Sequence, residues 1–89
     1  MEFEFDPAKS RANWEKHGID FSEAQRLWEL PIVEVRLNYP LEERWLVVGK
    51  LDQKYWTAVV THRESRVRLI SVRRSRAEEK KLHEQAVSS

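Results

Sequence analysis

The spacing of apolar residues changes along the chain, and this change separates expected strands from expected helices. Apolar and polar residues alternate, as in half-buried strands, in five short segments: 2–5, 32–37, 44–50, 55–61 and 66–72. The last four follow one another through short links, one of them the hairpin loop 51–54. An antiparallel meander is therefore expected for these four strands.

Helical spacing or capping signals mark three further segments: 7–17, 21–29 and 75–87. In the second helix, apolar residues at helical spacing should face the core: Phe21, Ala24, Leu27 and Trp28. The last helix has the Ser75 and Glu78 spacing of a capping box. Its apolar positions are sparse, so we expect it to dock weakly or to be held partly by a partner.

The first two predicted helices have well-defined ends. Asp6 is placed to cap a helix whose first residue is Pro7, where a missing N–H costs nothing. Gly18 supplies the left-handed residue that ends this helix. Asp20 then caps the second helix, with Glu23 as its capping-box partner.

These elements predict an α+β fold of order β-α-α-β-β-β-β-α, with helices on one face of an antiparallel sheet. The length of 89 residues fits one domain spanning residues 1–89. Four tryptophans are many for this length, and each falls in an apolar register that favours core packing: Trp14, Trp28, Trp45 and Trp56.

Composition narrows the class of protein. The absence of cysteine excludes a disulfide framework and a thiolate metal site. The acidic first residues do not form a secretion signal, and no apolar run approaches the ~20 residues of a membrane span. A soluble cytoplasmic protein without membrane contact is therefore expected.

Charge is unevenly distributed, although the net charge is only +1. Residues 1–60 contain eight Lys/Arg and eleven Asp/Glu, whereas residues 61–89 contain eight and four. Arginines outnumber lysines in residues 61–89. The planar guanidinium group of arginine presents paired donors that suit bidentate contact with a phosphate. The alternative is a solvated strand face that protects a sheet edge from aggregation.

The first third of the chain resembles the BrnT family of bacterial type II toxins, in which a strand precedes D-P-x-K-x-x-x-N-x-x-K-H-G and F-x-E-A. The matching residues occur in that order and spacing: Asp6, Pro7, Lys9, Asn13, Lys16, His17, Gly18, Phe21, Glu23 and Ala24. Later family motifs correspond to Glu42–Trp45, Thr61–Arg63 and 68–75. Val72 and Ser75 replace alanines of the last motif, and neither change removes a charge.

This resemblance implies a fold of the RelE type and cleavage of messenger RNA without a metal or other cofactor. It also implies a ribbon-helix-helix antitoxin (BrnA-like), a 2:2 complex with it, and contact with promoter DNA through that complex. Such cleavage needs a base for the 2′-hydroxyl, an acid for the leaving 5′-oxygen and positive charge on the phosphate.

Residues of these types give a candidate catalytic set: Lys16, His17, Arg44, Arg63, Arg68, Arg73 and His83. Additional RNA contacts are expected from Lys9, Arg66 and Arg74. We assign Arg63, Arg68 and Arg73 to phosphate, and His17 or His83 to proton transfer. No set of side chains has metal-ligand spacing.

Each histidine has a second interpretation. His17 lies at a helix C-terminus, where a cation stabilises the helix dipole. His62 falls in a turn, where it is expected to be solvated. His83 replaces the tyrosine usual in the family, so it either packs against the sheet or donates a proton in the tyrosine's place.

Two other functions remain open. In one, the chain is a non-catalytic module that binds the antitoxin and helps repress the promoter. In the other, it binds nucleic acid without cleaving it, and strong salt dependence without strand scission would indicate this.

Overall fold

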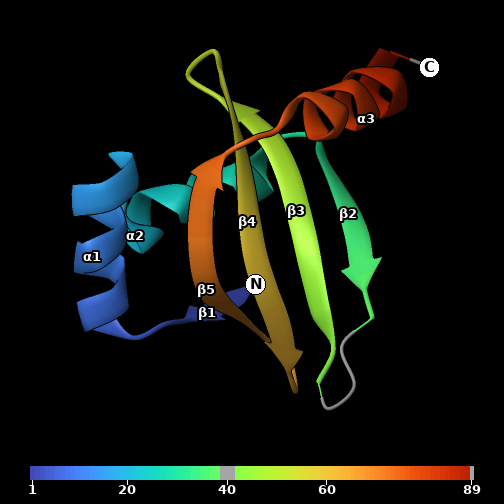
Figure 1. Ribbon diagram of the computed structural model, residues 1–89. Coiled ribbons are helices and arrows are strands. Elements are labelled where there is room, and N and C mark those ends of the chain that lie inside the picture. Colours follow the sequence, from blue (N-terminus) through green and yellow to red (C-terminus); the bar gives the residue numbers. More distant parts are fainter. Residues whose placement is uncertain (39–41, 89) are drawn as a thin grey trace.

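The computed structural model describes residues 1–38 and 42–88, in which all the predicted elements are present (Figure 1). The elements are β1 (Glu2–Glu4), α1 (Pro7–His17), α2 (Phe21–Ala24), the 3₁₀ helix η1 (Gln25–Glu29), β2 (Ile32–Leu37), β3 (Arg44–Leu51), β4 (Lys54–Arg63), β5 (Arg66–Arg74) and α3 (Ala77–Ser88). The second predicted helix is therefore α2 followed by η1. Its predicted core residues are confirmed, since Phe21, Ala24 and Leu27 are fully buried and Trp28 packs against the core.

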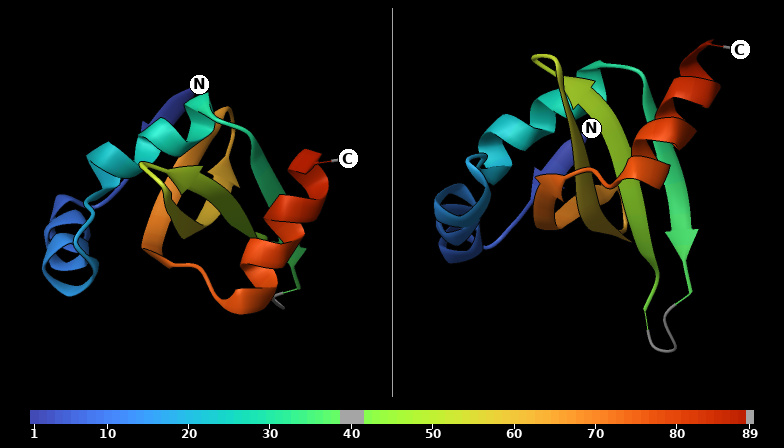
Figure 2. Two further views of the ribbon diagram at one scale, coloured as in Figure 1. Left: turned by 90° about the horizontal axis from the view of Figure 1, so that it is seen from above. Right: turned by 45° about the horizontal axis from the view of Figure 1, so that its top comes forward.

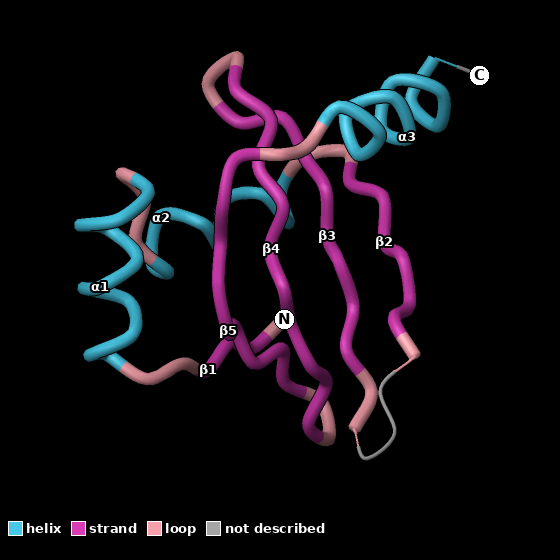
Figure 3. The backbone as a smooth tube through the Cα atoms, in the orientation of Figure 1, coloured by secondary structure: helices cyan, strands magenta, loops and turns pink. Residues whose placement is uncertain are grey.

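The five strands form one sheet in the order β1-β5-β4-β3-β2 (Figure 3). The predicted antiparallel meander is confirmed for β2 to β5. β1 instead runs parallel to β5, with Phe3 opposite Val67, so the sheet is mixed. The helices α1, α2 and η1 connect β1 to β2 at opposite edges of the sheet, which leaves β1 at the free edge of β5.

Helices cover both faces of the sheet rather than one (Figure 2). On the inner face, α2 packs against β5 and η1 against β3, over a row of paired residues that includes Val47, Ala58 and Val72. On the opposite, outer face, α3 packs against β2 and β3. The prediction of a single helical layer is wrong because α3 is held by polar side chains of the outer face and not by the apolar core.

The core lies between the inner face and the helices α2 and η1. Gly49 lets η1 approach closely, since a Cβ there would lie 2.9 Å from Leu27 Cδ2 and 3.0 Å from Ile32 Cγ2. Trp56 is buried in this core, whereas Trp14 is 54% exposed on α1. Core packing is therefore confirmed for three of the four tryptophans, with Trp28 and Trp45 partly buried, and is wrong for Trp14.

The ends of α1 and α2 follow the sequence prediction. Asp6 Oδ1 accepts a hydrogen bond from the Ala8 N–H at 2.9 Å, and Asp20 Oδ1 accepts one from the Glu23 N–H at 2.7 Å. Gly18 ends α1 with a φ of 78°, in the left-handed region. These caps fix the sharp corner between the two helices.

Buried polar side chains tie this corner to the sheet. Ser10 Oγ accepts a hydrogen bond from the Phe21 N–H at 2.9 Å. The Asn13 amide donates to the Ile19 carbonyl at 2.7 Å and accepts from the Val72 N–H at 3.1 Å. Asn13 is 7% exposed, so it joins α1 to β5 from within the protein.

Candidate functional site

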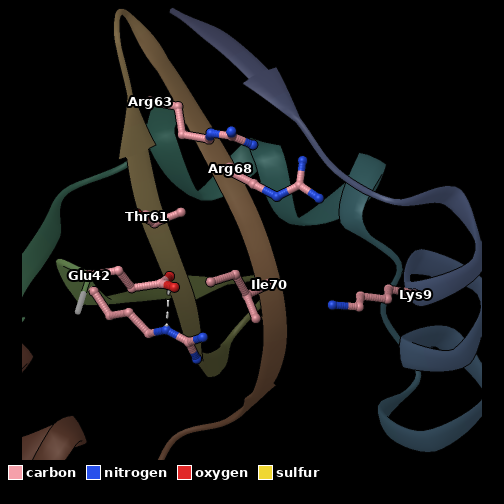
Figure 4. Close-up of a pocket in the computed structure, with 7 residues that line it drawn as sticks. Lys9, Glu42, Thr61, Arg63, Arg68 and Ile70 are labelled. Carbon is pink, nitrogen blue, oxygen red and sulfur yellow. Dashed lines mark hydrogen bonds and ion pairs between the residues drawn. The ribbon is translucent and has the colours of Figure 1, made fainter. Parts of the chain in front are cut away.

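The outer face has a half that α3 covers and a half that it leaves open. We define the covered half by Thr57 and Arg73, which pair across β4 and β5, and the open half by Thr61 and Arg68, which pair further along the same strands. A hollow of about 420 Å³ occupies the open half. Its lining residues come from α1, the segment before β3, and the strands β3, β4 and β5: Lys9, Glu42, Arg44, Thr61, Arg63, Arg68 and Ile70 (Figure 4).

A β-bulge in β5 controls which arginines share the outer face. Val60 pairs with Leu69 and Val59 with Ser71, so Ile70 is an extra residue between them. In a regular strand Arg68 and Arg73 would point to opposite faces, because side chains alternate. The extra residue places both on the outer face, and bulges of this kind commonly re-aim a side chain beside a functional site.

The hollow contains more cations than anions. Three arginines and Lys9 line it, whereas Glu42 is the only carboxylate among its lining residues. Glu42 Oε1 accepts a hydrogen bond from Arg44 Nε at 3.2 Å. Figure 4 shows the Lys9 side chain extending from α1 toward the sheet. The arrangement surrounds a position for an anion with donors from separate elements.

Two guanidinium groups of the hollow, those of Arg63 and Arg68, lack a close carboxylate partner among the described residues. The shortest Arg68–Glu4 nitrogen–oxygen distance is 4.0 Å, and the Arg68 side chain is 35% exposed. The side chain of Arg63 makes no hydrogen bond or ion pair with the residues that the structure describes. Ion pairs this long and this exposed contribute ~0–1 kcal/mol to stability, so a bound phosphate can replace them.

Arg73 differs from these arginines because α3 supplies it with a close partner. Its Nη1 and Nη2 donate to Glu79 Oε1 and Oε2 at 2.8 and 2.9 Å. Glu79 Oε1 also accepts hydrogen bonds from the Thr57 hydroxyl at 2.9 Å and the Arg76 N–H at 2.8 Å. The structure therefore places Arg73 in the contact that fixes α3 and not in the hollow.

This contact changes the acidity of Glu79. The hydrogen bond from Arg73 is the largest cause that lowers the pKa of the Glu79 carboxyl from 4.5 to about 2, against the opposing effect of burial. Glu79 also occupies the third position of α3 and reaches back to the Arg76 N–H, as in half of a capping box. The predicted Ser75–Glu78 box is thus wrong by one residue, since α3 begins at Ala77.

Two other predicted RNA contacts lie on different faces. Arg66 is on the outer face opposite Arg63 and lines a neighbouring hollow with Glu4, Arg63 and Glu64. Arg74 lies after the bulge and stacks over Trp56, with 5.4 Å between its Cζ and the ring centroid. Arg74 therefore belongs to the inner face.

The predicted residues at the end of α1 are not in the hollow. Lys16 and His17 occupy the last turn of α1. They lie seven and eight residues beyond Lys9, ~10–12 Å along the helix axis. The spacing of Lys9, Asn13, Lys16 and His17 predicts that they lie close to one face of α1, but of these four Lys9 alone lines the hollow, and Asn13 is buried.

The other two histidines also lie elsewhere. His83 is 6% exposed, its Nε2 lies 3.0 Å from the Pro31 carbonyl oxygen, and its ring packs edge-on against Tyr55. Of its two interpretations, the structure therefore favours packing. His62 is exposed at the end of β4, where its ring contacts Trp45.

Three lining residues were missed as site candidates: Glu42, Thr61 and Ile70. Each falls inside a segment that matches a family motif, two or fewer residues from a predicted arginine. Thr61 pairs with Arg68 across β4 and β5. Once the register of an antiparallel hairpin is known, the residue opposite each arginine is fixed, and this pairing is the signal that could have identified Thr61.

Comparison with protein-family models gives a match to the family described as the ribonuclease toxin, BrnT, of type II toxin-antitoxin systems, over residues 5–79. The match includes every residue that lines the hollow. No curated protein matches the chain. Within 1–38 and 42–88, no helix is long and apolar enough to cross a membrane.

Proposed function

The chain belongs to the BrnT family of ribonuclease toxins of type II toxin–antitoxin systems, and we propose that it cleaves RNA at the arginine-lined hollow of its outer face without a metal ion. The observation that carries this proposal is the convergence of Arg44, Arg63 and Arg68 on one hollow with Lys9 and a single carboxylate. This composition matches a phosphate that gains negative charge during reaction.

The reaction is attack of the ribose 2′-oxygen on the adjacent phosphorus. The new bond joins this oxygen to phosphorus, the bond from phosphorus to the 5′-oxygen breaks, and the products end in a 2′,3′-cyclic phosphate and a 5′-hydroxyl. The 2′-hydroxyl loses a proton and the 5′-oxygen gains one. Arginine donors fixed by strands stabilise the extra charge of the intermediate state.

The hollow suggests a base and an acid for these proton transfers. Glu42 is the lining residue able to accept the 2′-hydroxyl proton, and Arg44 orients its carboxylate. Lys9 carries an ammonium that reaches the hollow from the opposite side and can donate a proton to the leaving oxygen. Each role contributes typically ~10²–10⁴-fold to the rate. These assignments replace the histidines expected from the sequence.

The test is cleavage of naked RNA by the purified protein in EDTA, with product ends identified by mass spectrometry. We expect 2′,3′-cyclic phosphate ends. Glu42→Gln and Lys9→Ala should each slow cleavage by about 10²-fold. Cleavage that depends on added Mg²⁺ contradicts metal independence, and intact RNA both alone and in a translating extract contradicts the ribonuclease activity.

Matched controls lie beside both residues. Glu43 is the neighbour of Glu42, but its carboxylate pairs with Arg36 at 3.1 Å on the edge strand. Lys16 is on the same helix as Lys9 but at the far end. Glu43→Gln and Lys16→Ala should retain cleavage within about twofold, because neither side chain lines the hollow.

The family implies an antitoxin partner. The proposal extends to a ribbon-helix-helix antitoxin, a 2:2 complex and contact with promoter DNA through it, and to arrest of translation in the cytoplasm. Induced expression should stop growth with loss of RNA, and co-expression of the antitoxin should restore growth. Growth unaffected by a folded protein that binds the antitoxin would favour the non-catalytic, co-repressor function.

A further inference from the structure

A second hollow of about 410 Å³ adjoins the first along the outer face, and the two share Arg63. Its other lining residues are Glu4, Glu64 and Arg66. Because Arg63 lines both, the two hollows are neighbours on the outer face. The second hollow lies at the end of the β4–β5 hairpin, where Arg63 and Arg66 pair.

The spacing of the arginines matches a chain of phosphates. Arg66 and Arg68 project from the same face of β5, two residues apart, which corresponds to ~7 Å along a strand. This separation is close to the distance between neighbouring phosphates of an extended RNA strand. Arg63 lies directly opposite Arg66 on β4 and adds a second donor beside it.

Glu4 marks the position of an anion between these arginines. Its Oε2 lies 3.8 Å from Arg66 Nη1 and 4.0 Å from Arg68 Nη1. Both distances are too long for hydrogen bonds, so the pairs are weak and exchangeable. Arg66 also pairs with Glu2 at 3.5 Å, and its side chain is 52% exposed. A phosphate oxygen entering here competes with a loosely held carboxylate.

We propose that the second hollow is a subsite for the phosphate next to the one that is cleaved, with Arg66 as its principal contact and Glu4 as a competing anion. This inference rests on the proposed function for the identity of the first phosphate. The substrate class that follows is single-stranded RNA with at least two consecutive phosphates. Arg66 then determines affinity, whereas Arg68 acts on the reacting phosphate.

Salt dependence of binding tests the subsite without requiring cleavage. Affinity for a 2′-O-methyl oligonucleotide, which cannot be cleaved, is measured by fluorescence anisotropy over a range of salt concentrations. Each phosphate contact to a single strand contributes about −0.7 to the slope of log K against log salt. Arg66→Ala should make the slope less negative by about 0.7, and Arg66→Lys, which keeps the charge, should restore it.

A matched control separates the subsite from general charge. Arg26 has a side chain 50% exposed and pairs with Asp52 at 3.3 Å, but it belongs to η1 on the inner side of the sheet. Arg26→Ala removes one charge and should leave the slope unchanged. If Arg66→Ala and wild type have equal slopes of log K against log salt, the subsite proposal is contradicted. It is also contradicted if Arg66→Ala and Arg26→Ala change the slope equally.

Kinetics supply the second readout. On an RNA with several phosphates, Arg66→Ala should raise KM by about 10-fold and leave kcat within twofold, and Glu4→Gln should lower KM. A dinucleotide with one phosphate should not distinguish Arg66→Ala from wild type. A fall in kcat for Arg66→Ala overturns the inference, whereas a wild type that binds RNA with the expected slope but never cleaves it contradicts only the proposed function.

Discussion

The open and covered halves of the outer face each contain an arginine of β5, but the two arginines have different partners. Arg68 in the open half has a carboxylate 4.0 Å away, whereas Arg73 in the covered half donates two hydrogen bonds of 2.8 and 2.9 Å to Glu79. Both belong to β5 and both face outward because of the bulge at Ile70. The difference lies in what is opposite them: solvent in one half and α3 in the other.

We infer from this contrast that Arg68 is available to a substrate and Arg73 is not, because only Arg73 has a close carboxylate partner. The covered half uses a part-buried, bidentate pair to hold a helix with few apolar residues. In the open half, the ion pairs of Arg66 and Arg68 with Glu4 are long, at 3.8 and 4.0 Å. Changes in the covered half should therefore affect stability, and changes in the open half should affect RNA cleavage.

The largest effect on stability is expected for Glu79→Ala. Removing this carboxylate leaves the Arg73 side chain, 23% exposed, without its carboxylate partner, and the Thr57 hydroxyl and the Arg76 N–H each lose one acceptor. Breaking a buried pair costs about 3–5 kcal/mol, and we expect about 3 kcal/mol here because the pair is part-buried. Urea denaturation measures it. Unchanged stability with lost RNA cleavage would place Glu79 in the active site and break the comparison.

Low pH should weaken the contact between Glu79 and Arg73, because the Glu79 carboxyl becomes protonated. The folded-state pKa of Glu79 is lowered to about 2, so its contribution to stability is complete above its unfolded pKa of 4.5 and is lost as the pH falls toward 2. The advantage of wild type over Glu79→Gln in urea denaturation should shrink across this range. An advantage that does not change between pH 6 and pH 2.5 would show that the ion pair does not stabilise α3.

A smaller effect is expected for His83→Phe in the covered half. The substitution keeps an aromatic ring against Tyr55 but removes the hydrogen-bond partner of the Pro31 carbonyl. The free energy of unfolding should fall by about 1 kcal/mol, with RNA cleavage by the folded protein unchanged. A loss of cleavage at unchanged stability would instead support proton donation by His83.

The smallest effect is expected for His17→Gln. His17 lies at the end of α1 away from the open half and does not line the hollow. Cleavage should stay within about twofold of wild type, and unfolding free energy within about 0.5 kcal/mol. A hundredfold loss of cleavage would require His17 to reach the substrate and would extend the site beyond the hollow.

The elements and helix caps were predictable from the sequence because local chemistry determines them. Asp6, Gly18 and Asp20 act at the helix ends as their residue types require. The meander followed from alternating strands with short links. The family motif around α1 mainly stabilises this corner, since Asn13 is buried in hydrogen bonds to Ile19 and Val72.

The division of the outer face was not predictable, because it depends on contacts between distant segments. Alternation alone places Arg66, Arg68 and Arg74 on one face and Arg73 on the other. The bulge at Ile70 instead places Arg73 on the outer face and Arg74 on the inner face. The pairing of Arg73 with Glu79 further depends on where α3 docks, which its sparse apolar residues do not specify.

The most direct test compares Arg68→Ala with Arg73→Ala on the same preparations, measuring RNA cleavage rate and unfolding free energy for both. The account predicts that Arg68→Ala loses about 10²-fold in cleavage while its stability changes by less than about 1 kcal/mol. Arg73→Ala should lose about 3 kcal/mol of stability and keep its cleavage rate under conditions where it is folded. Loss of cleavage in a stable, folded Arg73→Ala, or full activity in Arg68→Ala, would contradict the division of the outer face into a catalytic and a structural half.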